Sequence, residues 1–159
     1  MRKSALLIVS LLAMVCARAD VLSPASVAGQ IDRLGADQAV HQLVASGEYD
    51  RVLNHIQNGN GRWIALAPRL APGTDAGTAE DLGIALAYAL PENPEAVLSV
   101  IDGKDGPVIG VSRVCGVPFI EGTIGDVHAY TERAVAAVSR ADRPDLAHVR
   151  LACLDALQR

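Results

Sequence analysis

The sequence predicts an all-α domain, an irregular bundle of about six to eight short helices held by one disulfide. Apolar residues recur at the three- and four-residue spacing of helix faces, and no segment alternates apolar and polar residues for long. Glycine, proline and asparagine separate these segments at short intervals. Successive short helices with leucine- and alanine-rich faces also resemble the stacked helical hairpins of HEAT-like proteins, although no fixed repeat period is present.

The first nineteen residues have the layout of a secretory signal peptide. Arg2 and Lys3 precede an apolar core, and small residues frame a cleavage site before Asp20. That core is too short to cross the roughly 30 Å hydrocarbon layer of a membrane as a helix. We therefore expect a cleaved signal over residues 1–19 and a single domain over residues 20–159. This predicts a periplasmic or secreted protein with no stable membrane insertion after cleavage.

The expected mature chain is acidic. The full sequence carries 14 basic and 18 acidic residues. Loss of Arg2, Lys3 and Arg18 with the signal leaves 11 basic residues against 18 acidic ones, a net charge of −7. Such a surface repels nucleic-acid phosphates and anionic lipids and attracts basic partners. The composition therefore excludes nucleic acid as an expected partner and favours another protein of the cell envelope, a basic one.

Two cysteines, Cys115 and Cys153, remain in the expected mature chain, because Cys16 lies within the signal. An even pair in an exported protein predicts a disulfide. The alternative is two buried free thiols. On the chain-entropy model, closing this loop of about 39 residues stabilises the fold by roughly 4 kcal/mol.

Capping residues and chain breakers delimit the expected helices. Ser23 before Pro24 is a helix start, because serine caps helices and proline is favoured at the first helical position. Thr78 with Asp81 has the spacing of a capping box. The expected helices are residues 24–47 interrupted at Gly35, residues 49–57, residues 63–70, a helix from Thr78 to Leu90, one starting at Asn93-Pro94, a long helix from about Val127, and a last helix opening at Pro144.

Each helix is expected to bury one apolar face. The helix before Pro91 has apolar residues too dense for a single stripe, so we expect it to be buried on most sides. The valine-rich residues 108–114 are the only weak strand candidate. The faces expected to point inward include Val27, Ile31 and Leu34; Val40, Leu43 and Val44; Val52, Leu53 and Ile56; Val127, Tyr130, Ala134 and Val138; and Leu146, Val149, Cys153 and Leu157.

Cofactor and metal motifs are missing from the sequence, so no cofactor is expected. The four histidines never stand three or four residues apart, the spacing that places two metal ligands on one helix face. Residues 102–106 lack the alternating ligands and closing glutamate of a calcium loop, and they read as a solvated connection.

One group of residues has the composition of a catalytic site. Glu121, Asp126 and His128 fall where a loop enters a helix, which can present carboxylate and imidazole together as a general base or metal ligands. The competing interpretation places Asp126 at the helix N-terminus, where negative charge is favourable, and His128 on the exposed face.

Trp63 and Asp75 are candidate partner-binding residues. Tryptophan is enriched among the residues that dominate binding energy at interfaces. A single tryptophan among apolar neighbours is more often a core residue. Asp75 ends the loop segment Pro72-Gly73-Thr74-Asp75, whose polar groups can be displayed to a partner.

Several segments together resemble a group of small secreted proteins of Gram-negative bacteria that have no known activity. The resemblance implies export and paired cysteines, and it implies no catalytic residues. The segments are Gly61-Arg62-Trp63-Ile64-Ala65-Leu66-Ala67-Pro68, Pro72-Gly73-Thr74-Asp75-Ala76-Gly77, residues 90–98, residues 114–121, and Cys153-Leu154.

These observations favour an exported, non-enzymatic protein-binding module of the cell envelope, with an inhibitor or immunity-type neutraliser of an envelope-acting protein as a narrower version. The alternatives are a small hydrolase or other enzyme that uses Glu121, Asp126 and His128, and a carrier of an apolar ligand enclosed by its helices.

Overall fold

The computed structural model describes residues 21–119 and 125–159, and it confirms the all-α prediction. The expected signal peptide lies outside the described residues. Within them there is no strand, only an isolated bridge between Asp102 and Gly110. The helices are α1 (Pro24–Leu34), α2 (Ala36–Ala45), α3 (Glu48–Gln57), α4 (Gly61–Ile64), α5 (Ala67–Leu70), α6 (Ala76–Ala89), α7 (Pro94–Leu98), α8 (Val111–Cys115), α9 (Val127–Arg140) and α10 (Ala147–Leu157), with 3-10 turns η1 (Ala71–Gly73) and η2 (Pro144–Leu146).

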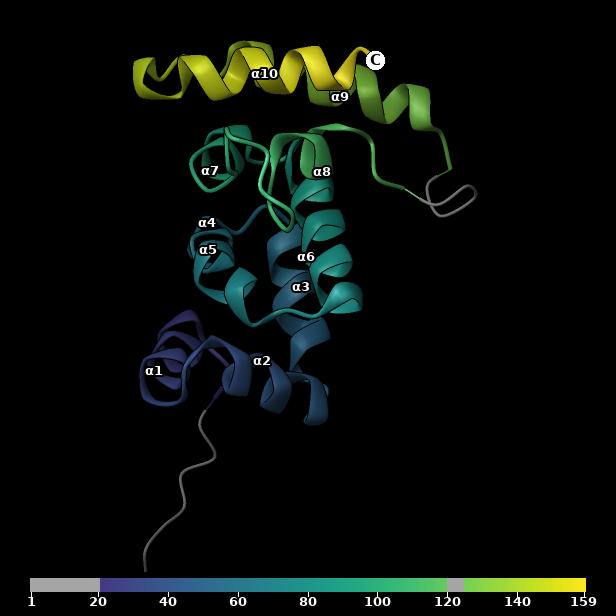
Figure 1. Cartoon of the computed structure of the whole chain (residues 1–159). Coiled ribbons are helices and arrows are strands. Elements are labelled where there is room, and N and C mark those ends of the chain that lie inside the picture. Colours follow the sequence, from purple (N-terminus) through teal and green to yellow (C-terminus); the bar gives the residue numbers. More distant parts are fainter. Residues whose placement is uncertain (1–20, 120–124) are drawn as a thin grey trace, which may run out of the picture.

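The helices stack in layers along one axis (Figure 1). Helices α1 and α2 form one end, α3 and α6 the middle, and α9 and α10 the other end. Along this stack α2 packs on α1 and α3, α3 on α6, α6 on α8, and α10 on both α8 and α9. Successive helices thus stack as expected for helical hairpins. Their lengths range from 4 to 14 residues, so the stack has no regular repeat.

Helix α6 is the centre of the stack. It contacts α3, α7 and α8, and its buried side chains include Leu82, Ala85, Leu86 and Ala89. This burial on several sides confirms the prediction made from its dense apolar residues. Buried residues from both ends of the stack join it in one continuous hydrophobic core.

The start of α6 differs from the prediction. The helix begins at Ala76 with Asp75 as its cap, so the assignment of Thr78 as the cap was wrong. An Asp75 carboxylate oxygen accepts the Thr78 N–H at 2.9 Å, and the Thr78 hydroxyl accepts the Asp75 N–H at 2.9 Å. Aspartate is a stronger cap than threonine, and Thr78 completes the box as its third helical residue.

The single helix expected over residues 63–70 is two one-turn helices, α4 and α5. Asn60 caps α4 by accepting the Arg62 N–H at 3.2 Å. Pro68 explains the division, because it has no N–H and its ring clashes with the carbonyl four residues earlier in a continuous helix. That carbonyl belongs to Ile64, where α4 ends.

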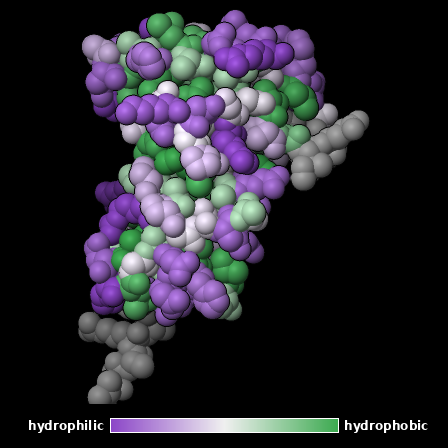
Figure 2. All heavy atoms as spheres, viewed as in Figure 1, coloured by the Kyte–Doolittle hydropathy of each residue, from purple (hydrophilic) through white to green (hydrophobic). Residues whose placement is uncertain are grey.

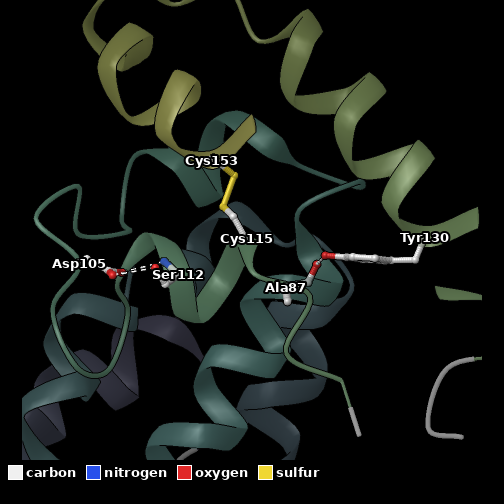
Figure 3. The surroundings of a disulfide bond; sticks show 6 residues. All are labelled: Ala87, Asp105, Ser112, Cys115, Tyr130 and Cys153. Atoms are coloured by element: carbon white, nitrogen blue, oxygen red, sulfur yellow. Dashed lines mark hydrogen bonds between the residues drawn. A yellow bond between two sulfur atoms is a disulfide. The ribbon is translucent and has the colours of Figure 1, made fainter. Parts of the chain in front are cut away.

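The valine-rich residues 108–114 form no strand; their second half begins α8. Gly110 stands at the cap position and offers no side chain. Asp105 supplies the cap across the loop, accepting the Ser112 N–H and the Ser112 hydroxyl, each at 2.7 Å (Figure 3). These hydrogen bonds hold the pKa of Asp105 below its usual value.

Three valine or leucine residues expected on buried faces are instead partly exposed. Leu34, Val44 and Val127 keep 42%, 48% and 47% of their surface. Each lies at or next to a helix end, where no neighbouring helix covers it. The spacing predicted these helices correctly, but it does not show at which residue the contact with a neighbouring helix ends.

The disulfide is confirmed. Cys115 in α8 and Cys153 in α10 are bonded, with their Cα atoms 5.3 Å apart, and both side chains are fully buried (Figure 3). The bond closes a loop across a sequence separation of 38 residues. It therefore fastens the last helix to the layer that packs on α6.

Two tyrosine hydroxyls fasten the neighbouring helices to the α6 backbone. Tyr49 of α3 donates to the Thr78 carbonyl near the start of α6, at 2.8 Å. Tyr130 of α9 donates to the Ala87 carbonyl near its end, also at 2.8 Å (Figure 3). Burial raises the pKa of both phenols, so both remain protonated donors well beyond neutral pH.

Replacing both cysteines with alanine (C115A/C153A) should lower the free energy of unfolding by about 4 kcal/mol, because the open loop regains its chain entropy. Urea denaturation of the variant and of the oxidised and reduced wild type measures this. The reduced wild type keeps both sulfur atoms, so it separates loss of the cross-link from loss of packing. Equal midpoints for the oxidised and reduced wild type would contradict the prediction.

Tyr49→Phe and Tyr130→Phe should each lower the free energy of unfolding by about 1 kcal/mol, because each removes one hydrogen bond and keeps the ring. The Ala87 carbonyl retains the Leu90 N–H, which limits the loss at Tyr130. Denaturant titration measures both changes. Tyr88→Phe is the control, since its hydroxyl has no hydrogen bond within residues 21–119 or 125–159; an equal loss there would refute the assignment.

Candidate functional site

The surface has clusters of charged side chains but no large apolar patch among the exposed residues that the structure describes. The large apolar side chains that are exposed are scattered along the chain, and Figure 2 shows hydrophobic and hydrophilic residues interspersed over the face in view. Single exposed apolar residues are normal on soluble domains and indicate no interface by themselves. Clusters of charged side chains and hollows in the surface are therefore the candidate sites.

Four exposed carboxylates gather at the N-terminal ends of α3 and α6, and we call this group the acidic end. It comprises Asp50 of α3 and Asp75, Glu80 and Asp81 at the start of α6. The Tyr49–Thr78 hydrogen bond brings these two helix ends together. None of the four carboxylates has an ion-pair partner within the described residues.

The carboxylates of the acidic end differ in what they do for the fold. Hydrogen bonds from Thr78 lower the pKa of Asp75, so its charge is used as the cap of α6. Partial burial raises the pKa of Asp81, and repulsion from Glu80, Asp50 and Asp75 raises it further. The charge on Asp81 is therefore unfavourable in the folded chain.

A hollow of about 190 Å³ adjoins the acidic end, between α2 and the start of α6. Val44, which is 48% exposed, lies on its wall, and Asp75 and Asp37 contribute carboxylates. Gly73 permits this arrangement, since a Cβ there would lie 2.2 Å from the Ala36 carbonyl carbon. The acidic end thus borders a small hollow with one exposed valine, Val44, on its wall.

Trp63 and Asp75, the two residues expected at a partner interface, have different positions. Trp63 is 4% exposed, and its ring stacks on His55 with centroids 4.8 Å apart and planes 6° apart. This position matches the core interpretation, and the ring offers almost no area to a partner. Asp75 is exposed and belongs to the acidic end.

The expected catalytic residues lie at the start of α9, except Glu121, which is outside the described residues. Asp126 caps α9 by accepting the Ala129 N–H at 3.0 Å. The His128 ring is 83% exposed and lies 3.7 Å from the Glu132 carboxylate. Asp126 and His128 therefore have separate partners, as the non-catalytic interpretation describes, and the catalytic role stays a prediction.

A second hollow, which we call the α9 groove, has a volume of about 740 Å³. It lies where the C-terminal ends of α3 and α6 meet the start of α9. Sequence reasoning singled out Asp126 alone among its carboxylates, because the wall is assembled from segments far apart in the chain. The lining residues are Gln57, Asn58, Tyr88, Pro91, Glu92, Gly125, Asp126, Ala129, Tyr130 and Arg133.

Two aromatic residues, Tyr88 and Tyr130, line the α9 groove, and Phe119 contacts both rings. Phe119 lies against Tyr88 at a centroid distance of 4.7 Å and meets Tyr130 edge-on at the same distance. Because the Tyr130 hydroxyl is bonded to α6, the ring cluster is fixed to the centre of the stack. The aromatic side of the groove is therefore formed by side chains of the helices α6 and α9.

The described residues contain no group of three or more histidine, cysteine, aspartate or glutamate side chains suited to hold a metal ion. Across the same residues, no helix has both the length and the apolar character needed to cross a bilayer. The acidic end and the α9 groove are the two candidate sites.

Comparisons with protein-family models, curated proteins and solved structures find no match for the chain. The resemblance to small secreted proteins of Gram-negative bacteria therefore stays a prediction, carried by the residues quoted for it.

Asp81→Asn should raise the melting temperature at about pH 7 and leave it nearly unchanged at about pH 3. The pKa of Asp81 is raised in the folded chain, so its contribution to stability is full at low pH and is lost as the pH rises through that pKa. Thermal unfolding at both pH values tests this. Asp155→Asn is the control: Asp155 pairs with Arg159, so its removal should not stabilise, and a gain there would contradict the repulsion argument.

Proposed function

We propose that the chain is an exported, non-enzymatic protein-binding module of the cell envelope whose acidic end recognises a basic protein. The carrying observation is the placement of Asp81 beside three other exposed carboxylates, none of which has an ion-pair partner within the described residues. The signal-like layout of residues 1–19 and the paired cysteines support the proposal that the protein is exported.

Folding alone does not account for the acidic end. Asp75 has a structural role as the cap of α6. The negative charge of Asp50 is favourable because it lies in the first turn of α3. Glu80 and Asp81 stand beyond the first turn of α6, and the charge on Asp81 is disfavoured where it is. A group that costs stability in the free protein is typical of a functional surface, where a ligand relieves the cost.

The chemistry of the acidic end fits lysine and arginine side chains of a partner. Cations placed among the four carboxylates would remove their mutual repulsion, so binding gains more than an isolated surface ion pair provides. The field of the patch would also speed encounter with a basic protein at low salt. Val44 and the adjoining hollow provide the apolar contact that stable interfaces place beside a charged rim.

A neutraliser of an envelope-acting enzyme or toxin is the version of this function that the scaffold favours. The stack is closed by a buried disulfide and by two tyrosine–backbone hydrogen bonds. A surface held this rigidly loses little conformational entropy on binding, which favours tight inhibition.

Capture from envelope extracts followed by quantitative binding tests the proposal. The tagged mature chain should retain a basic protein, and its affinity should fall steeply between about 0.05 M and 0.5 M salt. The variant D50N/D75N/E80Q/D81N should bind about tenfold or more weakly, measured by calorimetry. Asparagine at position 75 keeps a good helix cap, so the fold is preserved.

The control matched in net charge is D32N/D142N/D145N/D155N, which removes four carboxylates outside the acidic end, three of them ion-paired with arginine. It changes the net charge equally and should bind within about twofold of the wild type at moderate salt. If both variants lost the same affinity for the partner, net charge alone would explain the loss. A tight partner that is acidic, or no protein partner at all, would refute the proposed function.

A further inference from the structure

We infer that the α9 groove is a binding site for an arginine side chain of a partner protein. The inference rests on the proposed function, which supplies the partner protein that carries the arginine. The binding site itself is argued from the chemistry of the groove. The groove lies at the end of the α3–α6 pair opposite the acidic end, so it is a separate site.

The electrostatic environment of the groove favours a cation. Gln57 ends α3, and Pro91 follows the end of α6, so two helix C-termini with their partial negative charge meet here. Glu92 and Asp126 add two carboxylates. The Asp126 carboxylate also caps the N-terminus of α9, so its charge is partly offset there.

Arg133 is the one cationic side chain among the described lining residues, and it does not balance these charges. Its guanidinium lies 3.9 Å from the Glu92 carboxylate, with both side chains more than half exposed. A contact of this length and exposure is weak and is readily exchanged for a closer one. Asp126 has no ion-pair partner in the described ranges.

The hydrogen-bonding groups of the groove select for donors. The amide nitrogen of Gln57 donates to the Asn54 side chain at 2.8 Å, and that of Asn58 donates to the Asn54 carbonyl at 2.6 Å. Both amide oxygens accept no hydrogen bond from the part of the chain that is described, so they remain as acceptors. Together with two carboxylates they suit the five N–H donors of a guanidinium better than the three of an ammonium.

The aromatic wall completes the match to arginine. Tyr88 is half-buried against Phe119, and Pro91 and Ala129 also line the groove. A planar guanidinium stacks on an aromatic face, and its aliphatic stem packs on apolar side chains. A volume of about 740 Å³ leaves room for the side chain and adjoining backbone beside Arg133.

The test is an NMR titration of the isotope-labelled mature chain with acetyl-Gly-Arg-Gly-amide, and with the same peptide carrying citrulline, the neutral isostere. The arginine peptide should give saturable shifts at the ends of α3 and α6 and at the start of α9. The citrulline peptide should bind about tenfold or more weakly, because it lacks the charge-assisted hydrogen bonds. Equal binding of both peptides, or shifts confined to the acidic end, overturns the inference.

Variants locate the site. E92Q/D126N should weaken the arginine peptide about tenfold, and asparagine at position 126 still caps α9. E132Q/D142N is the matched control: it also removes two carboxylates, both lie outside the groove lining, and it should leave binding unchanged. If E92Q/D126N failed to fold, the citrulline comparison on the wild type would still decide the question.

The two proposals fail in different ways. If D50N/D75N/E80Q/D81N weakens the captured partner and E92Q/D126N does not, the arginine site is refuted while the proposed function stands. If the arginine peptide binds the groove but no basic protein is captured, the groove stands and the proposed function falls. Loss of affinity in both variants supports both.

Discussion

The fixed position of α6 is the constraint on which the rest of the structure depends. The helix is buried between α3, α7 and α8, and a tyrosine hydroxyl from a neighbouring helix bonds to its backbone near each end. Tyr49 thereby sets where the start of α3 meets the start of α6. Tyr130 sets where α9 crosses the end of α6. The acidic end and the α9 groove are the surfaces produced at those two junctions.

The disulfide extends this constraint to the last layer. Packing fastens α9 to α7 and α10, but α10 is apolar on several sides and makes its main contacts with α8 and α9 alone. The Cys115–Cys153 bond joins α10 to α8, which itself packs on α6. With one tryptophan and one phenylalanine in the sequence, the core has little large aromatic surface to hold a terminal layer. A covalent link compensates for that shortage.

The sequence was sufficient for features that depend on neighbouring residues. Ser23 before Pro24 and Asn93 before Pro94 start helices where predicted, and the cysteine pair forms the expected bond. Features that depend on competition or on distant residues were missed. Asp75 outcompeted Thr78 as a cap, and Asp105 caps α8 from across a loop, which no local spacing reveals.

The candidate sites illustrate the same limit. Asp75 and Asp126 were visible as carboxylates at chain positions near helix starts, but their neighbours were not. The α9 groove needs amides from the end of α3 and rings from α6 and α9, and only the packing of those helices unites them. Asp81 was read as part of a cap, and its unfavourable charge became visible only in the fold, which partly buries the carboxylate and places Asp50 of α3 near it.

The acidic end and the α9 groove lie near opposite ends of α6, a separation smaller than the width of a standard protein interface. Helix α6 has 14 residues, so its ends are about 20 Å apart. A standard protein interface buries about 800 Å² on each partner, a patch roughly 30 Å across. The acidic end offers long-range attraction without a defined shape, whereas the groove offers a shaped site for one side chain. Charge at the first would bring a basic protein to the surface, and fit at the second would decide which basic protein remains bound.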